Sequence, residues 1–209
     1  MKLDLLDRSV VERISDSEVP IHYFYLPVIR NFYLRRFEMI FELMGNEKYE
    51  KLIEIGYGTG IMFPELAIRA RSLHATEIKD SSSILTDHLK SRNIDVTFTS
   101  GSICKLPYES NQFDCIVSVS VLEHIHELDS AMKEMRRILK PGGTAFFGFP
   151  AKNACMNGFF RISGYDPDKI HPNSDKFILK KAAEHFHVAS VNKLSFVIPL
   201  YVACKCIKK

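Results

Sequence analysis

An apolar run that ends in three alternate glycines constrains this chain more than any other stretch. The run is Leu52–Ile55, and the glycines are Gly56, Gly58 and Gly60. Glycine adopts positive φ and has no Cβ, so a turn of this composition lets the backbone approach a ligand closely. A helix expected over about 61–71 would point its N-terminal amides at the same ligand. This order of strand, turn and helix is typical of a parallel α/β sheet that binds a nucleotide.

The spacing of the glycines separates two kinds of nucleotide site. A site for a nicotinamide dinucleotide has the pattern G-x-G-x-x-G, whose third glycine would stand where this chain has Ile61. The chain instead reads E-x-G-x-G-x-G from Glu54 to Gly60. We therefore expect a ligand other than NAD, and hydride transfer is disfavoured.

A second acid supports an adenosine ligand. Glu77 ends a short apolar run over 73–77 and stands 21 residues after Gly56. A carboxylate at this place accepts hydrogen bonds from both ribose hydroxyls, which favours an adenosine without a 2′-phosphate. The alternative is that Glu77 caps the helix expected to begin near Ser81. The two roles are compatible.

Three further motifs follow at regular intervals. They are G-S-I-C-K-L-P-Y over 101–108, a strand ending in L-E-H within 113–125, and R-I-L-K-P-G-G over 137–143. In order and spacing, residues 35–150 resemble the class I methyltransferases that use S-adenosylmethionine (SAM), and most closely those of ubiquinone and menaquinone biosynthesis. The resemblance implies SAM as cofactor, S-adenosylhomocysteine as product, and a doubly wound, Rossmann-like α/β sheet. It also implies seven strands in the order 3-2-1-4-5-7-6, with strand 7 antiparallel.

The resemblance implies cofactor contacts along the carboxyl ends of the strands. The chain departs from the family where Glu54 and Ser102 replace the usual aspartates, so Ser102 would meet the adenine amino group with an uncharged hydroxyl. Ile103 would then contribute its backbone N–H and cover the adenine ring. The expected cofactor-binding residues are Arg36, Glu54, Gly56, Tyr57, Gly58, Thr59, Gly60, Glu77, Ile78, Ser102, Ile103 and Val119.

Two of these residues have open alternatives. The resemblance implies that Arg36 holds the methionine carboxylate, because a guanidinium binds a carboxylate bidentately. Arg35 takes this role if the helix register differs, and a solvated basic face is the structural alternative. Tyr57 replaces the cysteine common at its position in the family, and either lies near the methionine end or packs in the core.

Methyl transfer from a sulfonium is an in-line displacement that needs orientation and a dry site more than a strong base. We expect direct displacement with oxygen slightly favoured over carbon or nitrogen as nucleophile. His22, His124, His126 and His171 are the candidate bases, and we assign catalysis to His124 and His171. Each also has a structural alternative, as part of the L-E-H turn or of a helix start at Ser174. The pair His124-x-His126 has no third ligand at fitting spacing, so we expect no metal.

Composition bounds the remaining classes. The 209 residues predict one domain, 1–209, with a helical cover (1–44), a SAM-binding core (45–150) and a substrate-side segment ending in a hairpin (151–209). A net charge of +3 disfavours nucleic acid as substrate. The five cysteines lack C-x-x-C spacing, and no apolar run approaches the ~18 residues that span a bilayer. We expect a cytoplasmic monomer or homodimer.

The expected elements alternate as in a parallel sheet. Strands are predicted near 51–55, 73–77, 94–99, 113–119 and 143–149, helices near 60–71, 81–92, 127–140 and 174–186, and two late apolar strands over 188–194 and 196–207. An aromatic-rich helix is expected from Pro27 to Met44. Its broad apolar face belongs to the core, to a lid or to a surface that touches membrane.

The acceptor is expected to be small and apolar. Two groups of aromatic and apolar side chains, which would flank the methyl group, motivate this expectation: Tyr23, Phe24 and Tyr25 in one segment, and Met156, Phe159, Phe160 and Tyr165 in the other. The alternative is that they close the core or a dimer contact. Two rival functions remain for the chain, an aminopropyl transferase of the same fold and a SAM-binding scaffold protein without catalysis.

Overall fold

A computed structural model describes residues 3–14, 27–79, 82–154, 157–158, 161, 166–195 and 198–209. These residues build one seven-stranded sheet in the order β3-β2-β1-β4-β5-β7-β6. Strand β7 runs antiparallel to both of its neighbours, whereas the other pairs are parallel. The predicted order and the antiparallel seventh strand are therefore confirmed. The strands are β1 (Tyr49–Ile55), β2 (Ala70–Glu77), β3 (Val96–Ser100), β4 (Phe113–Val119), β5 (Leu139–Pro150), β6 (His187–Ser195) and β7 (Pro199–Ile207).

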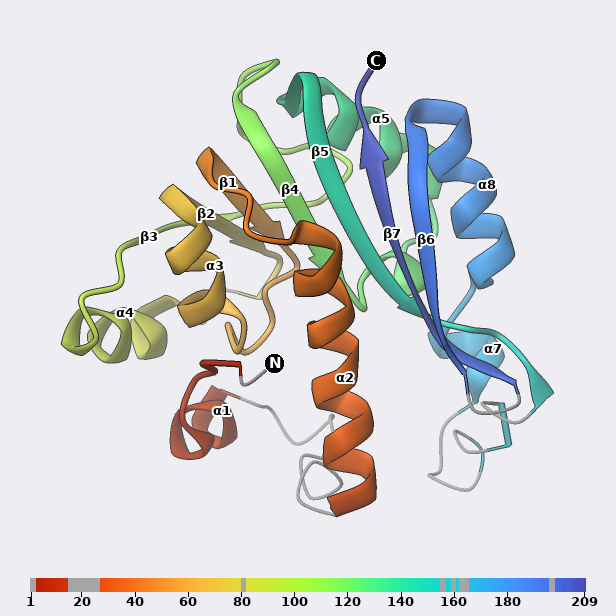
Figure 1. Cartoon of the computed structure of the whole chain (residues 1–209), viewed down its shortest axis with the longest axis horizontal. Coiled ribbons are helices and arrows are strands. Elements are labelled where there is room, and N and C mark those ends of the chain that lie inside the picture. The colour runs from red at the N-terminus through yellow and green to blue at the C-terminus, as the bar shows by residue number, and fades with distance from the viewer. Residues whose placement is uncertain are drawn as a thin grey trace.

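Helices cover both faces of this sheet, as Figure 1 shows. One face packs against α1 to α4, and the other packs against α5 and α8. Successive strand residues face opposite layers: Leu52 belongs to the first core cluster and Ile53 to the second. The helices are α1 (Arg8–Ile14), α2 (Pro27–Met44), α3 (Phe63–Arg69), α4 (Ser82–Ser91), the short 3-10 turn η2 (Leu122–His124), α5 (Leu128–Ile138), α7 (Pro167–Ile170) and α8 (Asp175–His185).

Most element boundaries differ from the sequence prediction by one to four residues, and α3 and β5 show physical reasons for the difference. Helix α3 spans only Phe63–Arg69, because Pro64 stands in its first turn and the chain enters β2 directly after Arg69. Strand β5 begins at Leu139, four residues before the predicted start at 143. Leu139 pairs with Phe113 of β4, so the K-P-G-G corner lies within the strand and not between helix and strand.

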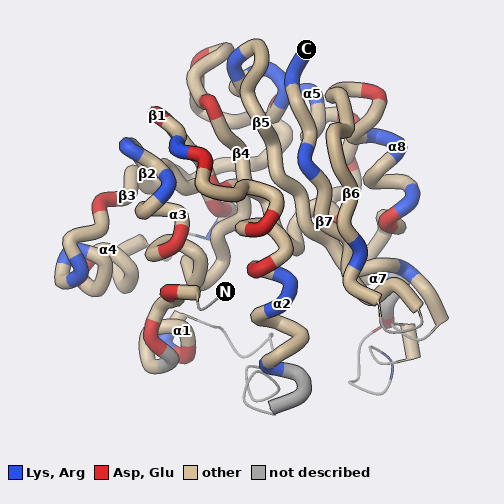
Figure 2. The backbone as a smooth tube through the Cα atoms, in the orientation of Figure 1, with Lys and Arg blue, Asp and Glu red and all other residues tan. Residues whose placement is uncertain are grey.

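The late apolar stretches form the predicted hairpin. Cys204 and Cys206 lie buried on one face of β7, with their sulfur atoms 3.9 Å apart. Both are free thiols, as are Cys104 and Cys115, and Cys155 lies outside the described residues. Over the described chain, acidic and basic residues are interspersed along the backbone (Figure 2). None of the described helices is long and apolar enough to cross a membrane.

Candidate active site

The three glycines after β1 all have positive φ, but they serve different purposes. A Cβ on Gly56 would lie 2.3 Å from Cγ2 of Val121, and a Cβ on Gly60 would lie 2.5 Å from Cε2 of Phe63. A Cβ on Gly58 would meet no described atom within 4 Å. Gly56 and Gly60 are thus required for packing within the protein. Gly58 is the glycine whose missing side chain leaves open space at the turn.

Glu77 is tied to the same turn. Its Oε2 accepts a hydrogen bond from the N–H of Gly58 at 3.0 Å, and its Oε1 accepts one from the N–H of Ile78 at 2.7 Å. Helix α4 begins at Ser82, and these contacts hold the carboxylate at the glycine turn. The ribose contact and the capping role both stay predictions. Carboxylate oxygens accept more than one hydrogen bond, so Glu77 keeps capacity for two ribose hydroxyls.

Glu54 is a buried acid below this turn. Only 4% of the residue is exposed, and its Oε2 has no hydrogen-bond partner among the described residues. Burial raises the pKa of Glu54 well above its ordinary value, and the nearby charge of Glu77 raises it further. The two carboxyl groups therefore differ in environment. The carboxyl group of Glu54 is enclosed by protein, whereas that of Glu77 lies on the exposed side of the glycine turn.

The predicted adenine contacts have unequal environments. Ile78 follows Glu77 and is 67% exposed, which suits a side chain that covers a bound ring. Ser102 is exposed, and its hydroxyl accepts a hydrogen bond from the N–H of Cys104 at 3.2 Å. Ile103 is buried in the second core cluster, so its side chain packs inside the protein. Only its backbone remains available for the predicted contact.

Thr59 and Val119 are half-buried at the ends of the turn and of β4. Tyr57 is buried, with its ring centroid 5.6 Å from that of Phe63 and 5.4 Å from that of Phe98. These contacts favour the packing role of Tyr57 over a direct cofactor contact.

Arg36 reaches the end of β4 from helix α2. Its Nη1 donates to Oγ of Ser120 at 3.2 Å, and its guanidinium carbon lies 3.9 Å from the ring centroid of Tyr33. The Nε of Arg36 is buried with no described hydrogen-bond partner. Arg35 points elsewhere, into exposed ion pairs with Glu38 and Glu42. The helix register therefore places Arg36, and not Arg35, at the site.

His124 and His171 come together beside Glu123. The two ring centroids are 4.8 Å apart, and Nε2 of His124 lies 3.9 Å from Oε1 of Glu123. One ligand atom from each of the three residues lies within 4.8 Å of the others. His126 is exposed on the following turn, and His22 lies outside the described residues. The structure thus assembles the two histidines chosen from the sequence.

Burial controls the protonation of this cluster. It lowers the pKa of His124 below its ordinary value, and it lowers the pKa of His171 to about 4, with further lowering by His124 and Lys152. Burial also raises the pKa of Glu123 to about 8, against the opposing charge of Arg36. Both imidazoles are therefore neutral near pH 7.

Hydrogen bonds across the chain hold the cluster in place. The Nδ1–H of His124 donates to the carbonyl of Ile170 at 2.6 Å. The side-chain amide of Asn173 donates to the carbonyls of Leu122 and Ile125, at 2.9 and 2.6 Å. The segment before α8 is therefore fastened to η2.

Sequence reasoning missed three participants in this region. Ser120 has a φ of +57°, which is rare for a residue with a side chain, and it contacts both Arg36 and the hydroxyl of Tyr201. Asn173 and Tyr201 had no local motif that could mark them. Glu123 was visible as the acid of the L-E-H turn, but its partners could not be read from neighbouring positions. The predicted aromatic walls, Tyr23–Tyr25 with Met156, Phe159, Phe160 and Tyr165, lie outside the described residues.

Known proteins share this sequence pattern over about half of the chain. Residues 53–147 match a family described as a methyltransferase domain. The ubiquinone/menaquinone biosynthesis C-methyltransferase UbiE of Pseudomonas putida is 31% identical over 108 residues, which are 49% of this chain and 42% of the relative. UbiE of Pseudomonas aeruginosa is 29% identical over 129 residues, which are 56% and 50%. The chain thus covers half or less of the length of these relatives.

Solved structures match the fold over most of the chain. The N-methyltransferase NodS from Bradyrhizobium japonicum, in complex with S-adenosyl-l-homocysteine, has a TM-score of 0.69 at 17% identity and covers 96% of this chain and 97% of NodS. A SAM-dependent methyltransferase from Aquifex aeolicus has a TM-score of 0.69 at 14% identity, with coverage of 98% and 100%. The [4+2]-cyclase SpnF has a TM-score of 0.69 at 18% identity, with coverage of 83% and 80%.

The motifs, the sheet order and the matched family agree. Residues 53–147 contain the glycine turn, Glu77 and the L-E-H turn, and they lie in a sheet of the expected order. Residues 53–147 therefore match the methyltransferase-domain family, and the chain has the fold of the SAM-dependent methyltransferases among the solved structures.

Proposed function

We propose that this chain transfers the methyl group of SAM to an oxygen atom of a small acceptor. The observation that carries the proposal is the turn at Gly58, where a Cβ would meet open space and where the N–H donates to the carboxylate of Glu77. An adenosine ribose placed against this turn would meet a fixed carboxylate and no obstructing side chain. The methionine end would extend toward Arg36 at the end of β4.

The proposed reaction is a direct displacement. The acceptor oxygen forms a bond to the methyl carbon, the carbon–sulfur bond breaks, and its electron pair stays on sulfur to give S-adenosylhomocysteine. A hydroxyl acceptor must also lose its proton. The neutral imidazoles of His124 and His171 lie at the same end of β4, and His124, with the less perturbed pKa of the two, is the better base at neutral pH.

Carbon is the competing nucleophile, because the UbiE relatives are named C-methyltransferases. The two outcomes differ in the product. Methylation of a phenolic acceptor on oxygen removes the ionisable hydroxyl, whereas methylation on carbon keeps it. Mass fragmentation of the product therefore assigns the methylated atom.

A SAM-binding protein with another reaction is the second candidate, because the matched SpnF structure is named a cyclase. The test is calorimetric binding of SAM and NAD, followed by turnover with a set of phenolic and quinol acceptors. Tight 1:1 binding of SAM without binding of NAD supports the site, and formation of S-adenosylhomocysteine that depends on an acceptor supports transfer. Binding without turnover on any acceptor would favour the second candidate.

The acceptor is proposed to be apolar and enclosed by the segments before α2 and after β5. Cytoplasmic location, and a monomeric or dimeric state, also remain predictions. Mass spectrometry of small molecules that purify with the protein tests the acceptor directly, since an apolar acceptor would be carried through purification. Recovery of only charged, water-soluble acceptors would contradict this part of the proposal.

A further inference from the structure

Glu123, His124 and His171 form a cluster of potential metal ligands that lies outside the glycine turn. Each offers one nitrogen or oxygen atom, and all three atoms lie within 4.8 Å of one another. Glu123 is 1% exposed, and its Oε2 has no hydrogen-bond partner among the described residues. A buried carboxylate oxygen is normally satisfied by a donor or a metal. The sequence offered no third metal ligand at fitting spacing for the pair His124-x-His126. The fold instead brings Glu123 and His171 close to His124.

We propose that Glu123, His124 and His171 bind one divalent transition-metal ion at the carboxyl end of β4. Two imidazoles and one carboxylate are ligands that suit zinc, cobalt, manganese and iron. Three protein ligands leave further coordination positions for water or for an oxygen of the acceptor.

The distances suit such an ion. A first-row metal binds nitrogen or oxygen at about 2.0–2.2 Å, so two ligand atoms on one ion lie at most about 4.2 Å apart. The separation of Nε2 of His124 and Oε1 of Glu123 is 3.9 Å and already lies within this limit. In the group as a whole, one ligand atom of each residue lies within 4.8 Å of the others. Side-chain shifts of about half an ångström would therefore bring all three atoms to one ion.

The hydrogen bonds around the cluster favour metal binding. The Nδ1–H of His124 donates to the carbonyl of Ile170 at 2.6 Å, which leaves the lone pair on Nε2 toward Glu123. A second hydrogen bond of this kind fixes the tautomer of most metal-binding histidines. Asn173 ties the segment that carries His171 to η2, and its N–H donates to the carbonyl of Glu123 at 3.3 Å. The three ligands are thus held in register before any ion arrives.

Two cationic side chains oppose the ion. Arg36 interacts electrostatically with Glu123, and Nζ of Lys152 donates to the carbonyl of His171 at 3.3 Å. Their positive charge repels a cation at this distance and weakens its binding. We therefore expect micromolar affinity, which lies below that of a structural zinc site.

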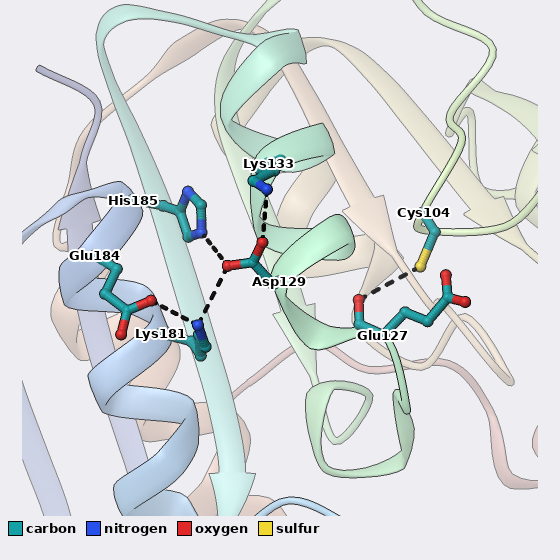
Figure 3. A network of polar contacts seen from close by, with 7 residues as sticks. All are labelled: Cys104, Glu127, Asp129, Lys133, Lys181, Glu184 and His185. Atoms are coloured by element: carbon teal, nitrogen blue, oxygen red, sulfur yellow. Dashed lines mark hydrogen bonds and ion pairs between the residues drawn. The ribbon is translucent and has the colours of Figure 1, made fainter.

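A second group offers an internal control. Asp129, Glu184 and His185 also bring three ligand atoms within 4.8 Å, between α5 and α8. Figure 3 shows that Lys133 and Lys181 both contact the carboxylate of Asp129. Asp129 already has Lys133 at 2.8 Å and His185 at 2.9 Å. Its charge is compensated, so this group should bind no ion.

The role of the ion rests on the proposed methyl transfer. A metal ion lowers the pKa of a coordinated hydroxyl, so the acceptor would lose its proton to solvent on binding. The resulting oxygen anion would attack the methyl carbon while the electron pair of the carbon–sulfur bond moves to sulfur. The ion would then replace a histidine as the device that activates the acceptor, and it would favour oxygen as nucleophile.

The test is a titration of the metal-free protein with Co²⁺ in the absence of SAM, followed by visible absorption and calorimetry. The d–d absorption bands report nitrogen and oxygen ligands directly, without turnover. We expect one ion per chain with micromolar affinity. His124→Gln, at a half-exposed side chain, should lower the affinity at least about tenfold. Glu123→Gln should do the same with almost no change of shape.

His126→Gln and His185→Gln are the matched controls and should leave cobalt affinity unchanged. Absence of 1:1 binding in the wild type, unchanged affinity in both His124→Gln and Glu123→Gln, or an equal loss in His185→Gln would overturn the proposal. SAM affinity is measured on the same samples. Cobalt binding without SAM binding would refute the proposed function and keep the metal site. SAM binding without cobalt binding would refute the metal site and keep the proposed function.

Discussion

Gly58→Ala separates the ligand role of the glycine turn from its structural role. Gly58 has a φ of +51°, and a Cβ there would meet no described atom within 4 Å. The new methyl group would thus disturb no protein contact, but it would stand in the space assigned to the cofactor. Gly142 is the matched control, because it has a φ of +75° and equally open surroundings at the start of β5, away from the site.

The expected magnitudes follow from these surroundings. Placing alanine at positive φ costs about 1–2 kcal/mol, which lowers the Tm of a chain of this size by about 2–8 °C. Both Gly58→Ala and Gly142→Ala should show this loss. Crowding of a tightly packed contact costs about 1–3 kcal/mol more, so SAM affinity should fall about 5- to 150-fold in Gly58→Ala alone. Gly56→Ala should fold poorly, because its Cβ would lie 2.3 Å from Cγ2 of Val121.

The assay is calorimetric titration with SAM beside thermal unfolding of each variant. Equal losses of Tm with unequal losses of SAM affinity support the assignment of Gly58 to the ligand. The reasoning is refuted if Gly58→Ala binds SAM as the wild type does, or if Gly142→Ala loses affinity to the same extent. In either case the cofactor would not lie against this turn.

Three further predictions concern neighbouring residues. Glu77→Gln should weaken SAM binding by about 1.5–3 kcal/mol, since hydrogen bonds to a charged group are lost, and unchanged calorimetric affinity would speak against the ribose contact. Arg36→Ala should reduce affinity for SAM more than for adenosine, whereas Arg35→Ala should affect neither, and equal losses for the two ligands would remove Arg36 from the carboxylate. The raised pKa of Glu54 in the folded state means that its stabilising contribution is present below about pH 4.5 and is lost as pH rises. Glu54→Gln should therefore raise Tm more at pH 8 than at pH 5, and a gain that does not change with pH would contradict this.

Much of the scaffold could be predicted because its signals are local. An apolar run followed by glycine, or by a turn with an acid, identifies each strand end independently of the rest. The family resemblance then supplied the strand order. The predicted start of β5 was wrong because Leu139-Lys140-Pro141 resembles a helix end. In the structure, Leu139 pairs with Phe113 and Lys140 forms an ion pair with Asp114. Such pairing is a long-range interaction that a local pattern does not contain.

The residues of the candidate site also divide into those that a local pattern predicts and those that it does not. Gly58 and Glu77 were predicted from spacing, because Gly58 follows the end of β1 and Glu77 ends β2. The partners of Glu123 were not predicted, because His171 stands 48 residues later and comes from the segment before α8. The packing of Tyr57 was also left open, because its neighbour Phe98 comes from β3. Residues that meet through tertiary packing have no fixed separation along the chain.

The L-E-H turn connects the two halves of the site. On one side, Val121 at its start fills the space beside Gly56, so the position of the turn and that of the glycine backbone depend on each other. On the other side, the imidazole of His124 and the amide of Asn173 fasten the turn to the chain before α8. The packing of the glycine turn and that of the segment before α8 therefore both depend on the position of η2.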